Sequence, residues 1–263
     1  CLPFEIKIEK RNEFKVDSVG YADFEGQLKH NVSAHPKVDK KTGELITFGY
    51  DLFGEDGTNL KYSLFDKENK LVNSLNIPIS GPVMIHDIAI TEQYVVFNDL
   101  PMEFKPEGIA MGNPAFMFDK TKPGKYGIMK RDCHDVSEIK WFELPNHFVF
   151  HYANAWEKKA DNGDDMIVMF GCALKEPNLE MKVEEADGSE HPFLWEDIQN
   201  DNRGKLTKFE FNLTTGESSM KLLVDEASDF PLIDMDIVGY ESQFTYLTYF
   251  AKDIPKEKNG VYS

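Results

Sequence analysis

Short segments rich in β-branched and aromatic residues recur along most of the chain. Residues 207–212 alternate polar and apolar side chains with a period of two, which is typical of a strand with one buried face. Segments of similar composition, most of them five to ten residues long, predict strands at 45–53, 61–66, 88–98, 126–130, 139–144, 147–151, 166–174, 206–212, 219–224 and 243–250. One helix is predicted, over residues 190–199.

Glycine-containing turns separate the predicted strands. Segments 39–44 (DKKTGE) and 214–217 (TTGE), and the pair Asp56-Gly57, put glycine where a hairpin needs a positive φ angle. The two TGE turns have similar flanks and suggest a recurring antiparallel unit. Many short antiparallel strands indicate an all-β propeller, sandwich or barrel. Since a four-stranded propeller blade takes about 40–50 residues, the chain has room for about four to five blades.

Charge and cysteine content narrow the class of protein. Acidic residues outnumber basic ones by 46 to 29 in the 263-residue chain, which disfavours nucleic acid as a partner because phosphate binding needs a basic surface. Three scattered cysteines form no CxxC pair and favour a reducing compartment. No apolar run approaches the roughly 20 residues that span a bilayer. Because the sequence starts at Cys1 without methionine, we expect a piece of a longer chain, so the lack of a targeting signal says little about location.

Three of the seven histidines are candidate metal ligands. His35 precedes a TGE turn, His86 lies at the start of an apolar strand, and His151 ends another apolar run. Separations of 51 and 65 positions are too long for one helix or hairpin to supply two ligands, but they suit one ligand from each of three blades, facing a common axis. Neutral imidazole suits Fe, Zn, Cu or Ni, so the ligand type leaves the metal open. The alternative for each is a packed or capping histidine. For His30, His134, His147 and His191 we expect structural or surface roles.

Longer motifs surround these three histidines. They are FEGQLKH (24–30) leading into AHPKVD (34–39), MIHDIAITE (84–92) followed by VVF (95–97), WFELPN (141–146) running into FH (150–151) and NAWE (154–157), and a weaker DFP (229–231). In these motifs, and over nearly its whole length, the sequence resembles the carotenoid cleavage dioxygenases, a non-haem iron family that includes the 9-cis-epoxycarotenoid dioxygenases of plants. Other catalytic signatures are missing from the sequence: it has no GxSxG, GxxxxGK[ST] or GxGxxG motif.

The resemblance implies a seven-bladed β-propeller with Fe2+ on its axis, held by four histidines. His35, His86 and His151 fall on three of the ligand positions, and no histidine after His191 supplies the fourth. Asp229 falls on a position, usually Glu, whose carboxylate orients a ligand histidine; two further carboxylates of this kind would lie outside the chain. Residues 1–263 are then an interior part of a single propeller domain, and we expect this part alone to be inactive and unstable.

The implied reaction adds both atoms of O2 across one C=C bond of a carotenoid or apocarotenoid, which enters an apolar tunnel, and gives two carbonyl products. Segments 150–156, 176–181 and 229–231 look closer to the plant-type enzymes that cleave the 9,10 and 9',10' bonds than to the epoxycarotenoid branch, which cleaves the 11,12 bond toward abscisic acid. The implied location is the cytoplasm or a plastid, with peripheral membrane contact left open for parts outside this chain.

Two other classes of function stay open. One is a propeller that has lost its iron and binds an apolar ligand or a partner protein without catalysis. The other is a zinc hydrolase that uses the three histidines and a water molecule. Metal identity separates the dioxygenase from the zinc hydrolase, since only the dioxygenase needs ferrous iron and loses its activity without O2.

Overall fold

Strands dominate the structure, a computed structural model that describes residues 2–10, 14–53, 59–109, 114–177, 179, 182–184, 190–192 and 203–249. Within these residues, helical structure is limited to α1 (Pro106–Ile109) and to the 3-10 turns η1 (Val136–Glu138) and η3 (Met235–Ile237). No helix in the described part of the chain has the length and hydropathy needed to cross a bilayer. The all-β class predicted from the sequence is confirmed.

Three antiparallel sheets of four strands form the body of the molecule. The first contains, in spatial order, β3 (Lys37–Val38), β4 (Leu45–Asp51), β5 (Asn59–Phe65) and β6 (Leu71–Pro78). The second contains β7 (Ala89–Ile90), β8 (Tyr94–Asp99), β11 (Gly124–Lys130) and β12 (Lys140–Leu144). The third contains β13 (Phe148–Lys159), β14 (Asp165–Leu174), β17 (Lys205–Asn212) and β18 (Ser218–Leu232), and is extended by β19 (Tyr246–Tyr249). Strands follow one another across each sheet in chain order, which is the form of a propeller blade.

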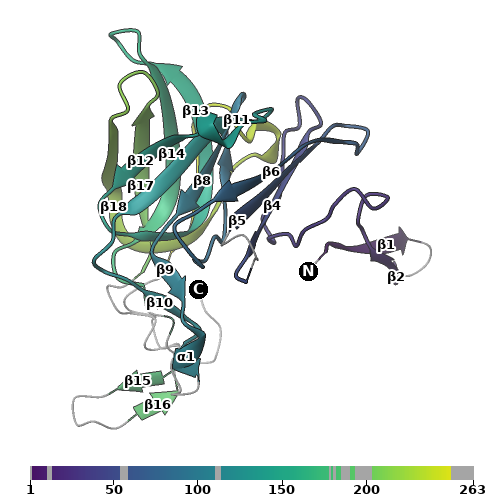
Figure 1. Ribbon diagram of the computed structural model, residues 1–263, viewed down its shortest axis with the longest axis horizontal. Helices are drawn as coiled ribbons and strands as arrows, with labels where there is room; N and C mark the ends of the chain where they lie inside the picture. Colours follow the sequence, from purple (N-terminus) through teal and green to yellow (C-terminus); the bar gives the residue numbers. More distant parts are fainter. Residues whose placement is uncertain are drawn as a thin grey trace, which may run out of the picture.

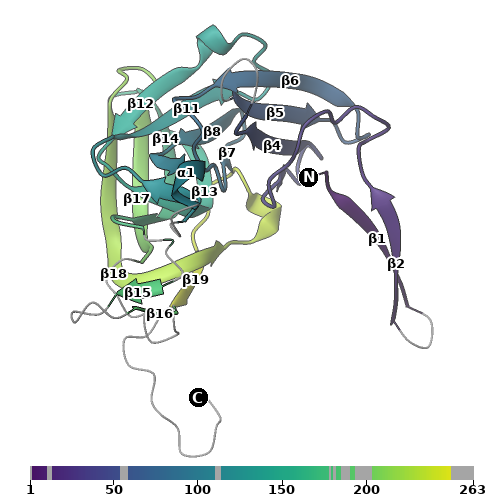
Figure 2. The ribbon, with the colours of Figure 1, turned by 60° about the horizontal axis from the view of Figure 1, so that its bottom comes forward.

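Shorter hairpins connect or flank these sheets. β9 (Met102–Phe104) pairs with β10 (Phe116–Phe118) between β8 and β11, and β15 (Lys182–Glu184) pairs with β16 (Glu190–Pro192) between β14 and β17. The N-terminal hairpin of β1 (Phe4–Lys10) and β2 (Phe14–Tyr21) stands apart from the sheets in both views (Figures 1 and 2). The four to five blades expected from chain length thus correspond to three complete four-stranded sheets in the described residues, with β1–β2 and β19 beside them.

The second sheet is buried on both faces, which explains its continuous apolar sequence. Val95 and Phe97 of β8 pack toward the first sheet, in a core shared with Ile46 and Leu60. Val96, between them, packs toward the third sheet, in a core with side chains such as Phe148, Ile167 and Phe209. Because neighbouring strand residues point to opposite faces, a strand between two cores needs apolar residues at every position. The sheets curl around a shared centre, with β7 and β13 on the inside and β6, β12 and β18 on the outside (Figure 2).

Both TGE turns adopt the conformation that the sequence predicts. Gly43 joins β3 to β4 at φ 78°, and Gly216 joins β17 to β18 at φ 81°. In each turn the glycine N–H donates to the backbone carbonyl four residues earlier, over 2.7 and 2.9 Å. The recurring unit is the turn alone, because it joins the first and second strands of one sheet but the third and fourth strands of another. The Asp56-Gly57 turn lies outside the described residues.

Two predictions of secondary structure are wrong. The strand predicted at 88–98 is two strands, because the chain reverses between β7 and β8. The Thr91 N–H donates to the Tyr94 carbonyl, and the Tyr94 N–H donates to the Thr91 hydroxyl. Where a helix was predicted at 190–199, the first three residues form the strand β16 instead, and Glu190–Pro192 pairs with β15. Pro192 has no N–H to donate within a helix, whereas an edge strand tolerates it. Residues 193–199 lie outside the described part of the chain.

Candidate metal centre

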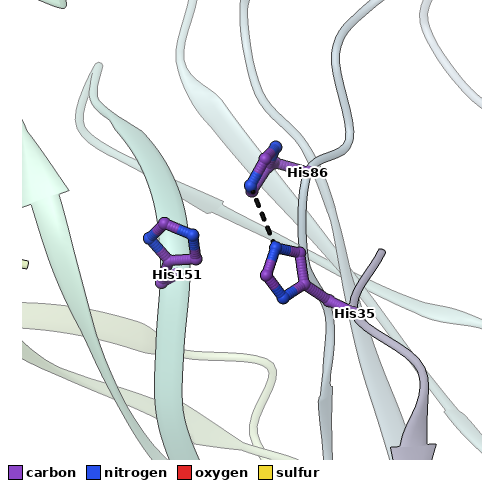
Figure 3. A group of neighbouring side chains, drawn as sticks. All are labelled: His35, His86 and His151. Carbon is purple, nitrogen blue, oxygen red and sulfur yellow. Dashed lines mark hydrogen bonds between the residues drawn. The ribbon is translucent and has the colours of Figure 1, made fainter. Parts of the chain in front are cut away.

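The three histidines singled out from the sequence come together at the inner side of the three sheets. His35 lies two residues before β3, His86 three residues before β7, and His151 within β13, so each belongs to the first strand region of its own sheet. Their rings face one another (Figure 3), with centroids 4.7 to 5.1 Å apart. One ring nitrogen from each lies within 4.8 Å of the others, and all three side chains are half-buried. The expected arrangement of one histidine per sheet around a common point is what the structure shows.

Irregular pairing in β13 turns His151 toward this point. From Val149 to Tyr152, β13 advances three residues while β14 advances only two, from Ala173 to Gly171, so the strand bulges at His151. A bulge re-aims a side chain that regular pairing would direct elsewhere. Gly171 makes room for it, because a Cβ atom there would lie 2.8 Å from the Tyr152 ring and 3.1 Å from the His151 carbonyl oxygen.

Local hydrogen bonds fix the segments that carry the other two histidines. The Ser33 hydroxyl donates to the backbone carbonyl of His86 over 2.8 Å and accepts the N–H of His35 over 3.3 Å. The backbone N–H of Ser33 in turn bonds the Phe48 carbonyl of β4. Nε2 of His35 lies 3.0 Å from Nε2 of His86 (Figure 3). One serine therefore couples two histidine-bearing loops of neighbouring sheets.

Burial favours the neutral form of His35 and His86. The pKa of His86 is lowered by burial and then by its neighbours His35 and His151. The pKa of His35 is lowered mainly by burial, an effect that the nearby Asp87 carboxylate partly offsets. A neutral imidazole has a free nitrogen lone pair, which is the form that binds metals.

Asp229 contacts the third histidine, as its position in the sequence motif led us to expect. Its Oδ1 lies 3.0 Å from Nδ1 of His151, and the backbone N–H of Phe230 donates to the same oxygen over 2.7 Å. This contact leaves Nε2 of His151 to face the other two rings. Phe230 has a φ of 52°, rare for a residue with a side chain, and its ring lies 5.0 Å from that of His151. Strain of this kind is concentrated at functional sites.

A cavity of about 620 Å³ opens beside the histidines. Apolar side chains from β7 and the residue before it, from the end of β18 and from η3 form much of its wall, among them Ile88, Ile90, Phe230, Leu232 and Met235. All three histidines and Asp87 line it as well. An apolar cavity with a few convergent polar groups is the usual form of a small-molecule site.

The other histidines whose side chains the structure describes lie outside this cluster. His147, four residues before His151, is buried in the core, where Nε2 lies 2.8 Å from the Tyr126 hydroxyl and Nδ1 lies 2.6 Å from the Pro145 carbonyl. His30 bonds Ser63 and the Asn31 carbonyl, and His134 is exposed. Their structural or surface roles agree with the prediction, while the side chain of His191 lies outside the described residues.

Sequence reasoning missed three residues of the site. Phe150 stacks edge-on against His86 with ring centroids 5.4 Å apart, and Phe230 lies against His151. Asp87 is buried beside His86. The adjacent pair His86-Asp87 was the one available signal, since a charged residue inside an apolar run requires a partner.

The chain is similar to known proteins over nearly its whole length. Residues 2–262 match the family model RPE65, described as retinal pigment epithelial membrane protein. The chain belongs to this family. The carotenoid 9,10(9',10')-cleavage dioxygenase 1 of Pisum sativum is 37% identical over 247 residues, which cover 94% of this chain and 42% of that protein. The chloroplastic 9-cis-epoxycarotenoid dioxygenase NCED6 of Arabidopsis thaliana is 30% identical, with 94% and 40% covered.

Solved structures superpose on most of the chain. The lignostilbene dioxygenase of Pseudomonas brassicacearum superposes with a TM-score of 0.73 at 26% identity, over 92% of this chain and 48% of that one. Cobalt-substituted Synechocystis ACO superposes with a TM-score of 0.71 at 23% identity, over 88% and 47%. This member of the RPE65 family therefore spans less than half the length of the relatives that it matches, and has the fold of the corresponding part.

Proposed function

We propose that this chain supplies three histidine ligands of a ferrous ion in an enzyme that cleaves a C=C bond of a carotenoid or apocarotenoid with O2. The observation that carries the proposal is the convergence of His35, His86 and His151 from three separate sheets in a member of this family. Histidines that were merely packed in three separate sheets would have no reason to point their rings at one another.

Two of the donor atoms have the spacing that a shared transition metal requires. Bonds of about 2.1 Å from one ion to two nitrogens put those nitrogens roughly 3.0 to 3.4 Å apart for right-angled or tetrahedral arrangements. The 3.0 Å between Nε2 of His35 and Nε2 of His86 lies in this range. Three neutral imidazoles without a carboxylate in contact with the ion suit iron, zinc, copper or nickel, and the family relation favours iron.

The chain's own residues would hold, orient and shield this centre. His35, His86 and His151 would bind Fe2+, and Asp229 would fix the ring of His151 by accepting its Nδ1–H. Iron, when bound, would supply the activation of O2. The apolar wall formed by Phe230, Leu232 and their neighbours would bind a hydrocarbon chain and exclude water from the reacting bond.

Cleavage at the 9,10 and 9',10' bonds is the reaction we propose. Its support is the higher identity to relatives of that name, 37% for the pea protein against 30% for NCED6. Cleavage of 9-cis-epoxycarotenoids at the 11,12 bond is the second candidate. The partners would be the polyene and O2, and the location a plastid or the cytoplasm; the relative NCED6 is named chloroplastic.

Oxygen dependence and metal identity test the proposal. The full-length protein is loaded with ferrous iron and incubated with a carotenoid in air and under argon, and the products are identified by mass spectrometry. We expect two carbonyl products in air, none under argon, and none when zinc replaces iron. Hydrolytic activity with zinc and without O2 would overturn the proposal in favour of a zinc hydrolase. Binding of the carotenoid without products in any condition would favour an apolar-ligand-binding propeller.

A further inference from the structure

Asp87 is a buried carboxylate that contacts all three histidine-bearing segments. Its side chain is buried, with 2% of its surface exposed. One oxygen, Oδ1, contacts the Lys37 ammonium over 2.6 Å and accepts the N–H of Ile88 over 2.8 Å. The other, Oδ2, accepts the backbone N–H of Tyr152 over 3.0 Å. Both oxygens are therefore engaged, and by different segments.

Each contact lies next to one of the histidines. Lys37 follows His35 by two residues, Asp87 directly follows His86, and Tyr152 directly follows His151. One carboxylate thus connects the three sheets at the place where their histidines converge. Its contacts reach the backbone and a neighbouring side chain, and none of the three imidazole rings is hydrogen-bonded to it.

The cost of leaving a buried charge or N–H group unpaired explains why Asp87 holds the three segments in place. A buried carboxylate is strongly unfavourable unless an opposite charge and hydrogen-bond donors surround it. The bulge in β13 turns the Tyr152 N–H away from its ladder, and this donor also needs a buried partner. Movement of any of the three segments would break one of these contacts and leave a charged or polar group unpaired in the interior.

We propose that Asp87 is a positioning residue that sets the mutual spacing of His35, His86 and His151. This inference rests on the proposed function, because the spacing matters through the metal that the histidines bind. Asp87 acts indirectly, because it fixes the backbone of the segments that carry the histidines, whereas Asp229 contacts a histidine ring.

The test is the change Asp87→Asn in the full-length protein. An asparagine side chain has one acceptor oxygen and one N–H donor group, so it satisfies Tyr152 or Lys37 but not both. We expect Co2+ to bind about 10- to 100-fold more weakly, as for other groups that orient metal ligands. The visible ligand-field spectrum of bound Co2+ should also change in shape, which a loss of stability alone would not cause.

Asp99→Asn is the matched control. Asp99 is also buried, at the end of β8, and it accepts two hydrogen bonds, from the N–H and hydroxyl of Ser80, at 2.8 and 2.7 Å. This variant loses a buried charge without touching the segments that carry the histidines. We expect lower thermal stability but an unchanged Co2+ spectrum and affinity.

Lys37→Met decides the question if Asp87→Asn does not fold. It removes the link to the segment of His35 while leaving the Tyr152 contact in place, so we expect weaker Co2+ binding and an altered spectrum. Spectra and affinities equal to wild type in the folded variants would overturn the role of Asp87. Failure of the wild-type protein to bind Co2+ or Fe2+ would instead overturn the proposed function.

Discussion

Two histidines four residues apart show how surroundings decide the chemistry of a side chain. Both ring nitrogens of His147 have partners in the core, the Pro145 carbonyl and the Tyr126 hydroxyl, so no nitrogen is left for a metal. His151 has one nitrogen against Asp229 and directs the other to the cluster. The same residue type on adjoining segments is thus a structural element in one place and a candidate ligand in the other.

Replacing Asp229 by asparagine tests the role of the carboxylate beside His151. An amide oxygen still accepts the Nδ1–H, but the negative charge that makes the imidazole a better ligand is lost. We expect about tenfold weaker iron binding or lower kcat, near the small end of the effect of such groups, with the fold retained. Asp225→Asn, an exposed position on the same strand, is the control and should leave both unchanged. Equal iron affinity and kcat in wild type and Asp229→Asn would contradict the assignment.

The stability of the fold should depend on pH through His147. Burial lowers its pKa from 6.5 to about 4, an effect that the Pro145 carbonyl partly offsets. Between these values the unfolded chain binds a proton that the folded chain does not, so stability is full above pH 6.5 and falls toward pH 4. One such group changes the free energy of unfolding by about 2–3 kcal/mol over this range. Denaturant titrations of wild type and His147→Gln should differ by this pH dependence, and parallel curves would contradict it.

At the scale of elements, interruptions of regular strands place the functional side chains. Register shifts in β13 and β18 lie at His151 and after Asp229. Regular strands alternate faces, whereas bulges direct selected residues inward. The site is therefore built where the ladders are locally broken.

Gly171→Ala should disturb the bulge at His151. The added Cβ atom would lie 2.8 Å from Tyr152, so the ring or the bulge must shift. We expect a loss of about 1–3 kcal/mol in the free energy of unfolding, as for overpacked cores, together with weaker metal binding. Gly81→Ala, where nothing lies within 4 Å of the added atom, is the control for both measurements. Wild-type metal affinity in Gly171→Ala would show that the bulge does not set the position of His151.

The sequence could predict strands and turns where local chemistry decides them. Composition identified β14 and β17 almost to their ends, and glycine identified the turns at Gly43 and Gly216. It could not predict the reversal at Thr91 or the strand at Glu190–Pro192, because one depends on two hydrogen bonds and the other on a distant partner. The motifs found the three histidines, but the role of Asp87 depends on contacts between residues 50 and 65 positions apart, which no local pattern records.

At the scale of the whole molecule, apolar surface is exposed on the N-terminal hairpin. Phe4, Ile6 and Ile8 alternate along β1 and are more than half exposed, as are Phe14 and Val16 of β2. A two-stranded hairpin with an open apolar face is not stable by itself in water. The hairpin therefore needs something to pack against.

The 263-residue chain produced alone should associate or melt without cooperativity. Its open strand edges and the apolar face of β1–β2 offer surfaces for pairing with other copies. Sedimentation and thermal melting, with full-length protein as the control, measure this. A monomeric chain with one sharp transition would contradict the expectation.

Metal analysis of histidine variants tests the central claim most directly. Full-length wild type, His86→Ala and the exposed control His134→Ala are purified under reducing conditions, and iron is measured per chain. If the three histidines hold the ion, wild type and His134→Ala should retain iron while His86→Ala loses both iron and cleavage activity. Retention of iron and unchanged product formation in His86→Ala would contradict the claim that the centre lies at these three residues.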